Sequence, residues 1–272
     1  MLGIENLSVS FSTSVGLLRK RQVCPLRNIN LAIGPGELLG IVGASGAGKS
    51  LLAHAIVGLL PPNAACAGRM RFAGEPLDQA RQAMLRGRRI TLVPQSVASL
   101  DPMARVGRQV SWAAQRAGMS KIDADAAART AAARFDLDPR ALRSFPHELS
   151  GGTARRVLLA MATMGTADLV IADEPTTGLD VETIGRVMQY FKALARKGKA
   201  VLIITHDIGA VVPVADRIVV MRDGESVETV PAASFRGRGE GLATDYARFL
   251  WQALPQNEFA AADPASRSVM AA

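Results

Sequence analysis

The chain has 272 residues, of which 49% are hydrophobic and 21% are charged. This length suits one large α/β domain with an inserted lobe, and this composition excludes wholesale disorder. Lysine and arginine outnumber aspartate and glutamate by 32 to 24, and the net charge of +8 suits nucleic acid, anionic lipid, phosphorylated ligands or an ordinary solvated surface.

No apolar run approaches the roughly 20 residues that span a bilayer. The N-terminus carries an early acid, Glu5, and no basic flank, so it does not resemble a secretory signal. Cys24 and Cys66 belong to no CxxC unit and the chain has only 3 histidines, so neither a disulfide scaffold nor a transition-metal site is expected. These features predict a soluble, intracellular chain.

Short apolar segments separated by turn residues predict β-strands. Alternating apolar residues predict strands over residues 2–11 and 28–33. Continuous apolar runs, typical of strands buried on both faces of a parallel sheet, then cover residues 38–42, 90–93, 169–172, 201–204 and 218–221. Asp223-Gly224 after the last run predicts a hairpin turn.

A block of different character separates two of these strands. Residues 113–134 are alanine-rich and helical in pattern, and the pattern resumes from Leu142, which predicts a helical lobe inserted into a strand–helix–strand core. One more helix is expected over residues 244–254. The alanine-rich tail from Ala260 is expected to be disordered.

The segment at residues 43–50 reads GASGAGKS and fits the pattern GxxxxGK[ST] between a buried strand and an apolar helix beginning at Leu51. Backbone N–H groups of such a loop surround phosphate oxygens, and the start of the helix adds partial positive charge. Lys49 can reach the β- and γ-phosphates, and the Ser50 hydroxyl can bind Mg²⁺. The segment predicts a nucleotide site, held by Gly43, Ser45, Gly46, Gly48, Lys49 and Ser50.

Two adjacent carboxylates follow the strand predicted over residues 169–172. Side chains alternate in direction along an extended segment, so Asp173 and Glu174 can serve different tasks. Asp173 is placed to hold Mg²⁺ through water, and Glu174 to polarise the water that attacks the γ-phosphorus. Such a pair is a weak signal alone, but beside the phosphate loop it predicts ATP hydrolysis.

A second glycine-containing segment, Ser150-Gly151-Gly152, precedes a helical run from Arg155 to Met164. A hydroxyl and two glycines at a helix start form an anion-binding site. A plain serine N-cap is the alternative interpretation of the same residues.

From about residue 1 to 230 these motifs, in this order, resemble the ATP-binding subunits of ABC transporters. The resemblance implies an α/β P-loop NTPase fold, an ABC ATPase domain with a RecA-like core, an N-terminal antiparallel β-subdomain and an inserted α-helical subdomain. It implies an ATP-binding domain over residues 1–235, the helical subdomain at about 96–160, and a C-terminal helix and tail over 236–272. The implied cofactors are ATP and Mg²⁺.

The resemblance assigns roles to further residues. Phe11 stands where the family stacks an aromatic ring on adenine, with a strand-core phenylalanine as the alternative. Asp180 matches the D-loop. Gln95 matches the Q-loop that senses Mg²⁺ and the γ-phosphate, and His206 matches the switch histidine that hydrogen-bonds the γ-phosphate. The implied catalytic residues are Glu174, His206 and Gln95, and the implied Mg²⁺ ligands are Ser50, Gln95 and Asp173.

The same resemblance implies an assembly. In the family each ATP lies between the phosphate loop of one subunit and the Ser-Gly-Gly signature of another, so a second ATPase subunit, a copy or a paralogue, is expected. ATP then binds the closed interface and its hydrolysis reopens it. Permease subunits, and indirectly an extracytoplasmic substrate-binding protein, are expected partners at the cytoplasmic face of the bacterial inner membrane. No nucleic-acid partner is expected.

Within the family, Phe145-Pro146-His147-Glu148 before the signature, Ser99-Leu100-Asp101-Pro102 and the late Trp251-Gln252-Ala253-Leu254-Pro255 are similar to importers of peptides, nickel and related metal chelates. Many peptide importers carry cysteines in a C-terminal extension, whereas the last cysteine here is Cys66, which favours nickel or a chelate. Thr153 and Arg155 depart from glutamines usual in the signature helix.

The resemblance also makes residues 95–107 the candidate surface for the permease. Three other classes stay open: a soluble ABC ATPase acting on nucleic acid or ribosomes, an exporter ATPase subunit, and a binding or scaffold paralogue that does not hydrolyse ATP.

Overall fold

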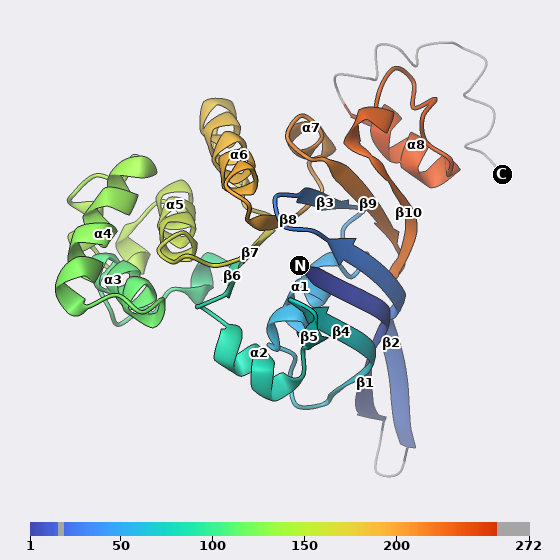
Figure 1. Cartoon of the computed structure of the whole chain (residues 1–272), viewed down its shortest axis with the longest axis horizontal. Helices are drawn as coiled ribbons and strands as arrows, with labels where there is room; N and C mark the ends of the chain where they lie inside the picture. The colour runs from blue at the N-terminus through green and yellow to red at the C-terminus, as the bar shows by residue number, and fades with distance from the viewer. Residues whose placement is uncertain (16–18, 255–272) are drawn as a thin grey trace.

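The computed structural model describes residues 1–15 and 19–254 and consists of two β-sheets with helices packed around them (Figure 1). The smaller sheet has the strand order β2-β1-β4-β5, with every neighbouring pair antiparallel. Its strands are β1 (Leu2–Val15), β2 (Arg19–Ile33), β4 (Ala64–Phe72) and β5 (Glu75–Pro76). The predicted N-terminal antiparallel subdomain is therefore confirmed.

The larger sheet has the order β10-β9-β3-β8-β7-β6. All of its neighbouring strands are parallel except β10, which forms an antiparallel hairpin with β9 through the predicted Asp223-Gly224 turn. Its strands are β3 (Leu38–Val42), β6 (Ile90–Val93), β7 (Leu169–Asp173), β8 (Ala200–Thr205), β9 (Arg217–Arg222) and β10 (Glu225–Pro231).

The continuous apolar runs have a direct physical cause, because both faces of the larger sheet are covered. Every residue of β3 is buried, and successive residues of the strand alternate between two separate hydrophobic cores. Leu38 and Val42 pack in the core that also contains Phe191, whereas Leu39 and Ile41 pack in the core on the face towards the smaller sheet. A strand in this position needs apolar residues at consecutive positions.

The helices occupy three places (Figure 1). α1 (Lys49–Val57) and α2 (Gln79–Leu85) lie on the side of the smaller sheet, and α6 (Val181–Arg196) and α7 (Ile208–Val211) lie on the opposite face of the larger sheet. α3 (Val106–Arg116), α4 (Lys121–Arg134) and α5 (Gly151–Ala162) form a separate arm. α8 (Asp245–Gln252) packs near β10, and short 3-10 turns cover Val97–Ser99, Ala141–Arg143, Pro146–Glu148 and Ala232–Ser234.

The arm corresponds to the predicted helical insertion, but the helical pattern over residues 113–134 is interrupted between α3 and α4. Gly118 adopts φ 103° after α3, and the Ser120 hydroxyl caps α4 by accepting from the Asp123 amide. A left-handed glycine followed by a serine cap ends one helix and starts another, and the alanine content of both helices hides the break.

Other elements carried too weak a pattern to be predicted. β4 lies across the surface, with most of its side chains exposed, so it lacks the apolar alternation of a half-buried strand.

The C-terminal helix was predicted within two residues at each end, and Thr244 caps it. The expected disorder from Ala260 lies outside the described residues, and the division at residue 235 stays a prediction.

Within the described ranges, no helix combines the length and apolar character needed to span a bilayer. Cys24 and Cys66 are free thiols at exposed positions.

The packing of α6 on the larger sheet predicts a large stability loss for Phe191→Ala. Phe191 is 0% exposed in the core that also contains Leu38 and Val42, and removing a buried phenylalanine side chain costs about 3–5 kcal/mol. Val181→Ala on the same helix, at a residue 87% exposed, is the control and should leave the free energy of unfolding nearly unchanged. Urea denaturation of both variants measures this, and equal midpoints would contradict the packing described.

Candidate nucleotide site

The loop from β3 to α1 carries the GASGAGKS segment, and close packing explains its glycines. A Cβ on Gly43 would lie 2.2 Å from the Met221 carbonyl oxygen, and a Cβ on Gly48 would lie 2.6 Å from the Leu26 side chain. Gly48 also has φ 91° and caps α1, which begins at Lys49 and not at Leu51. The loop can therefore pass this close to β9 and β2 only with glycine at these two positions.

Lys49 is buried beneath the loop that it follows. Its Nζ donates to the carbonyl oxygens of Gly43 at 2.8 Å and Ala44 at 3.0 Å. Burial lowers the pKa of Lys49, and the neighbouring carboxylates of Glu174 and Asp173 oppose that shift. The ammonium group is thus held by neutral carbonyls, which phosphate oxygens can replace as stronger, charged partners.

A cavity of about 570 Å³ opens beside this loop. It brings together predicted residues from four separate segments of the chain. Its lining residues are Pro25, Ser45, Gly46, Gly48, Lys49, Ser50, Leu51, Gln95, Glu174 and His206. The phosphate loop, the Q-loop glutamine, the second carboxylate and the switch histidine therefore face one space.

Three oxygen atoms suit Mg²⁺, two from the cavity-lining residues Ser50 and Gln95 and one from Asp173, which is buried behind the lining. Ser50 Oγ lies 3.1 Å from Asp173 Oδ1 and 3.5 Å from Gln95 Oε1. Among the described residues, no group of three or more His, Cys, Asp or Glu side chains is placed so that it could hold a metal ion. Mg²⁺ favours a few protein oxygens completed by phosphate and water, which is the donor set available here.

Asp173 ends β7 and is buried. Burial raises the pKa of its carboxyl group, partly opposed by the hydrogen bond from Ser50. An ionised carboxylate in this position is stabilised by a cation, which supports its assignment to the metal.

Glu174 does not continue the strand, so the expected alternation along an extended segment is wrong for this residue. It has φ 49°, a left-handed conformation that costs a non-glycine residue about 1–3 kcal/mol. Its amide donates to the Ile204 carbonyl at 2.8 Å, which holds the turn against β8. The turn, and not the strand, directs the two carboxylates to different places.

The Glu174 carboxylate is surrounded by donors from the end of β8. Oε1 accepts from the His206 amide at 3.0 Å and lies 2.8 Å from His206 Nδ1, and Oε2 accepts from Thr205 Oγ1 at 3.2 Å. The His206 side chain is 66% exposed, so its ring is free to turn towards a ligand. Thr205 was not predicted, although it directly precedes the switch histidine in the sequence.

The Ser-Gly-Gly signature lies outside the cavity lining. Ser150 caps α5 by accepting from the Thr153 amide at 3.2 Å, and its hydroxyl lies 2.9 Å from the Thr153 hydroxyl. A Cβ on Gly152 would lie 3.3 Å from the Gly178 carbonyl oxygen, which places the signature beside the D-loop. A Cβ on Gly151 would have no other atom of the fold within 4 Å.

Asp180 caps α6, accepting from the Thr183 amide at 2.9 Å and from its hydroxyl at 2.7 Å. These hydrogen bonds lower the pKa of Asp180. The residue lies outside the cavity lining, like the signature beside it.

Phe11 is half-buried in β1, opposite Val23 of β2 and Ala64 of β4, and packs against the core on that side. It is not among the cavity-lining residues, whereas Pro25 of β2 is. This position fits the strand-core interpretation, and contact with adenine stays a prediction.

Arg155, a departure from the family pattern, has a definite place. It is 5% exposed, and its guanidinium donates to the Pro94 carbonyl at 2.7 Å and to the Gln95 carbonyl. Burial lowers its pKa, and the carboxylates of Asp173 and Glu174 oppose that shift. Arg155 therefore ties the signature helix to the Q-loop backbone, a role that the sequence did not indicate.

The raised pKa of Asp173 predicts a stabilised variant. Because the folded protein binds this proton more tightly than the unfolded chain, stability falls as pH rises through the folded pKa, and the loss persists at neutral pH. Asp173→Asn should therefore unfold at a higher temperature than wild type at pH 7 without metal or nucleotide, with the difference narrowing near pH 4, the usual carboxyl range.

Asp180→Asn is the control, because the pKa of Asp180 is shifted in the opposite direction from that of Asp173. Hydrogen bonds from Thr183 lower the pKa of Asp180, so its ionised form contributes stability above the unfolded pKa. This variant should be no more stable than wild type at pH 7. Thermal unfolding followed by circular dichroism measures both, and an Asp173→Asn protein less stable than Asp180→Asn would contradict the assignment.

Comparisons with known proteins agree with this geometry. The family model described as ABC transporter matches residues 26–177. The Bacillus subtilis oligopeptide transport ATP-binding protein OppD is 36% identical over 241 residues, covering 84% of this chain and 65% of that protein. The OppD protein of Mycobacterium tuberculosis is 40% identical over 240 residues, covering 84% of this chain but 38% of its own length. The chain thus spans less than two thirds of the length of both relatives.

A solved structure shows the same fold. The dimeric ATP-binding cassette MJ0796, in a post-hydrolysis state bound to ADP and Pi, superposes with a TM-score of 0.75 at 29% sequence identity, covering 87% of this chain and 100% of that one. The family model, the relatives and the fold agree, and the chain belongs to the ABC transporter family as an ATP-binding domain.

Proposed function

We propose that this chain hydrolyses ATP as the nucleotide-binding subunit that energises import of peptides through a partner membrane permease, with nickel or another metal chelate as the second substrate class. The cavity that unites Lys49, Ser50, Gln95, Glu174 and His206 is the observation that carries the proposal. The two relatives are named for oligopeptide transport, which favours peptides over the nickel class that the cysteine pattern favours.

The residues divide the chemistry between them. The amides of the phosphate loop and Lys49 hold the β- and γ-phosphates, and Ser50, Gln95 and Asp173 provide oxygen ligands for Mg²⁺, which would neutralise charge on the phosphate oxygens. Glu174 accepts a proton from the attacking water, and its burial beside Thr205 keeps the carboxylate oriented.

His206 has to exchange partners for this to happen. In the structure its Nδ1 lies 2.8 Å from Glu174 Oε1. When the exposed ring turns to hydrogen-bond the γ-phosphate, Oε1 becomes available to the water. Binding of the γ-phosphate therefore frees the base that removes it.

The proposed assembly includes a second ATPase subunit, either a copy or a paralogue. Ser150, Gly151, Gly152 and Asp180 lie outside the cavity that holds the phosphate loop, so a facing subunit would supply its own signature to this ATP. The dimeric form of the similar cassette supports this pairing. ATP bound at the shared interface favours closure by mass action, and loss of the γ-phosphate reverses it.

The proposed location is the cytoplasmic face of the bacterial inner membrane, as a peripheral subunit that an extracytoplasmic substrate-binding protein affects only through the permease. Residues 95–107 are the proposed permease surface. Gln109 holds this segment, accepting from the Asp101 amide and donating to the carbonyls of Asp101 and Ala104. Met103 in the segment is 85% exposed.

The alternatives are a soluble ABC ATPase acting on nucleic acid or ribosomes, an exporter ATPase subunit, and a scaffold paralogue without hydrolysis. Co-purification with permease subunits separates the importer from a soluble ABC ATPase. An ATPase assay separates the classes that hydrolyse ATP from the scaffold paralogue that does not. The complete set of Lys49, Asp173, Glu174 and His206 favours hydrolysis.

Glu174→Gln tests the catalytic assignment. The variant should bind ATP as wild type does, lose about 100-fold or more of kcat because the general base is gone, and accumulate as an ATP-dependent dimer. Steady-state ATPase and light scattering with ATP measure both effects. Lys49→Ala is the control that should lose nucleotide affinity altogether; turnover near wild type in Glu174→Gln would refute the role.

Arg155→Gln tests the link between the signature helix and the Q-loop. Both hydrogen bonds come from the terminal nitrogens of Arg155, and the glutamine side chain ends two bonds short of them, so the Q-loop should become less well positioned while the P-loop is untouched. We expect kcat to fall about tenfold or more with little change in the affinity for ATP, since each hydrogen bond from a charged group is worth about 1.5–3 kcal/mol and about 1.4 kcal/mol is a factor of ten. An unchanged kcat would show that the link has no part in turnover.

A further inference from the structure

We propose that Tyr246 of the C-terminal helix α8 is a positioning residue for the phosphate loop and sets the affinity of this chain for nucleotide. The inference rests on the proposed ATP-binding function of the loop. It concerns a contact across the fold, because the Ala44 amide donates to Tyr246 Oη at 3.2 Å although the two residues are 202 positions apart.

The contact acts on one peptide unit. The Gly43 carbonyl and the Ala44 amide belong to the same peptide, and in a trans peptide the C=O and N–H bonds point in opposite directions. Lys49 Nζ binds the carbonyl at 2.8 Å on the cavity side, and Tyr246 binds the amide on the other side. The peptide is therefore clamped between the phosphate-binding lysine and the C-terminal helix.

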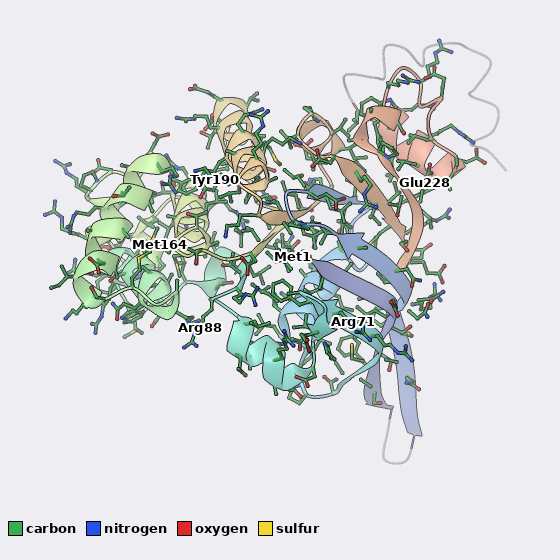
Figure 2. All side chains as sticks on the ribbon, viewed as in Figure 1. Met1, Arg71, Arg88, Met164, Tyr190 and Glu228 are labelled. Carbon is green, nitrogen blue, oxygen red and sulfur yellow. The ribbon has the colours of Figure 1, made fainter. Side chains whose placement is uncertain are left out.

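The tyrosine is itself held firmly. The Arg222 guanidinium lies over its ring, 5.0 Å from the centroid, at the end of the strand that passes beneath Gly43. The carboxylate of Glu228 accepts from the amides of Ala243 at 2.6 Å and Thr244 at 2.9 Å, and also from the Thr244 hydroxyl. These bonds fasten the start of α8 to β10, where Figure 2 labels Glu228 beside the helix.

Nucleotide binding changes the hydrogen bonding of the peptide between Gly43 and Ala44. When phosphate oxygens attract Lys49 Nζ, the Gly43 carbonyl loses a partner, and the Tyr246 hydroxyl is left to fix the orientation of the peptide. Without that hydroxyl, the peptide can rotate and a smaller fraction of the loop is ready to bind. The apparent dissociation constant rises in proportion to that loss.

Tyr246→Phe is the direct test, because it removes only the hydroxyl and keeps the ring over which Arg222 stacks. Loss of one hydrogen bond of about 1 kcal/mol corresponds to an affinity about fivefold weaker. We expect this weakening for ADP, and for ATP in EDTA, by isothermal titration calorimetry on the full chain. In steady state the change should appear in KM and not in kcat.

Tyr190→Phe is the matched control. Tyr190 is also half-buried, and its hydroxyl accepts from Arg134 at 3.3 Å, so the variant loses a comparable bond. Figure 2 shows Tyr190 on α6, well separated from Glu228 and α8. Nucleotide affinity should stay at the wild-type value in this variant, and the melting temperatures of the two variants should be similar.

The outcomes separate the two proposals. Weaker binding in Tyr246→Phe alone supports the positioning role. Wild-type affinity in Tyr246→Phe, or equal weakening in both variants, overturns it while leaving ATP binding by the chain intact. Failure of the wild-type protein to bind ADP or ATP overturns the proposed function, and this inference with it.

Discussion

The buried positive charge of Lys49 is the feature around which the nucleotide site is arranged. An ammonium group removed from water needs partners, and here two loop carbonyls bind it directly while Asp173 and Glu174 provide opposite charge nearby. Both carboxylates are buried as well, and Arg155 adds a second buried cation close to them. The site is thus a compact set of opposite charges.

The parallel sheet makes this arrangement possible. β3, β8, β7 and β6 are neighbours, and the residues at or just after their carboxyl ends are the phosphate loop, Thr205 and His206, the two carboxylates, and Gln95. Parallel strands end at the same edge, so segments distant in the sequence meet there. Glycine at positions 43 and 48, and the strained turn at Glu174, bring the backbone close enough for the side chains to share one cavity.

Two further ties connect this edge to the rest of the molecule. Arg155 joins the helical arm to the Q-loop, and Tyr246 joins the C-terminal helix to the phosphate loop. Each tie joins a helix to the backbone of a loop at the carboxyl edge of the sheet: Arg155 binds the carbonyls of Pro94 and Gln95, and Tyr246 binds the Ala44 amide.

The sequence by itself determined the nucleotide chemistry and most of the parallel sheet. Strands buried on both faces need continuous apolar runs, and the chemistry of the GASGAGKS loop depends on residue types at adjacent positions, so both are visible locally. The roles of Lys49, Ser50, Asp173 and Glu174 were predicted in this way, as was an anion site at Ser150 with a plain N-cap as the alternative. Gln95, Asp180 and His206 needed the resemblance to a family, because a single polar residue after a strand has many structural uses.

Only the tertiary structure decided the contacts between residues far apart in the sequence and the features that depend on backbone geometry. The break at Gly118 is hidden by alanine on both sides, the direction of Glu174 depends on a left-handed turn, and β4 has no buried face to produce a pattern. Arg155 and Tyr246 bind main-chain groups, which look the same at every position of a sequence. No residue type identifies its partner in such a bond, so these ties become visible only when the chain is folded.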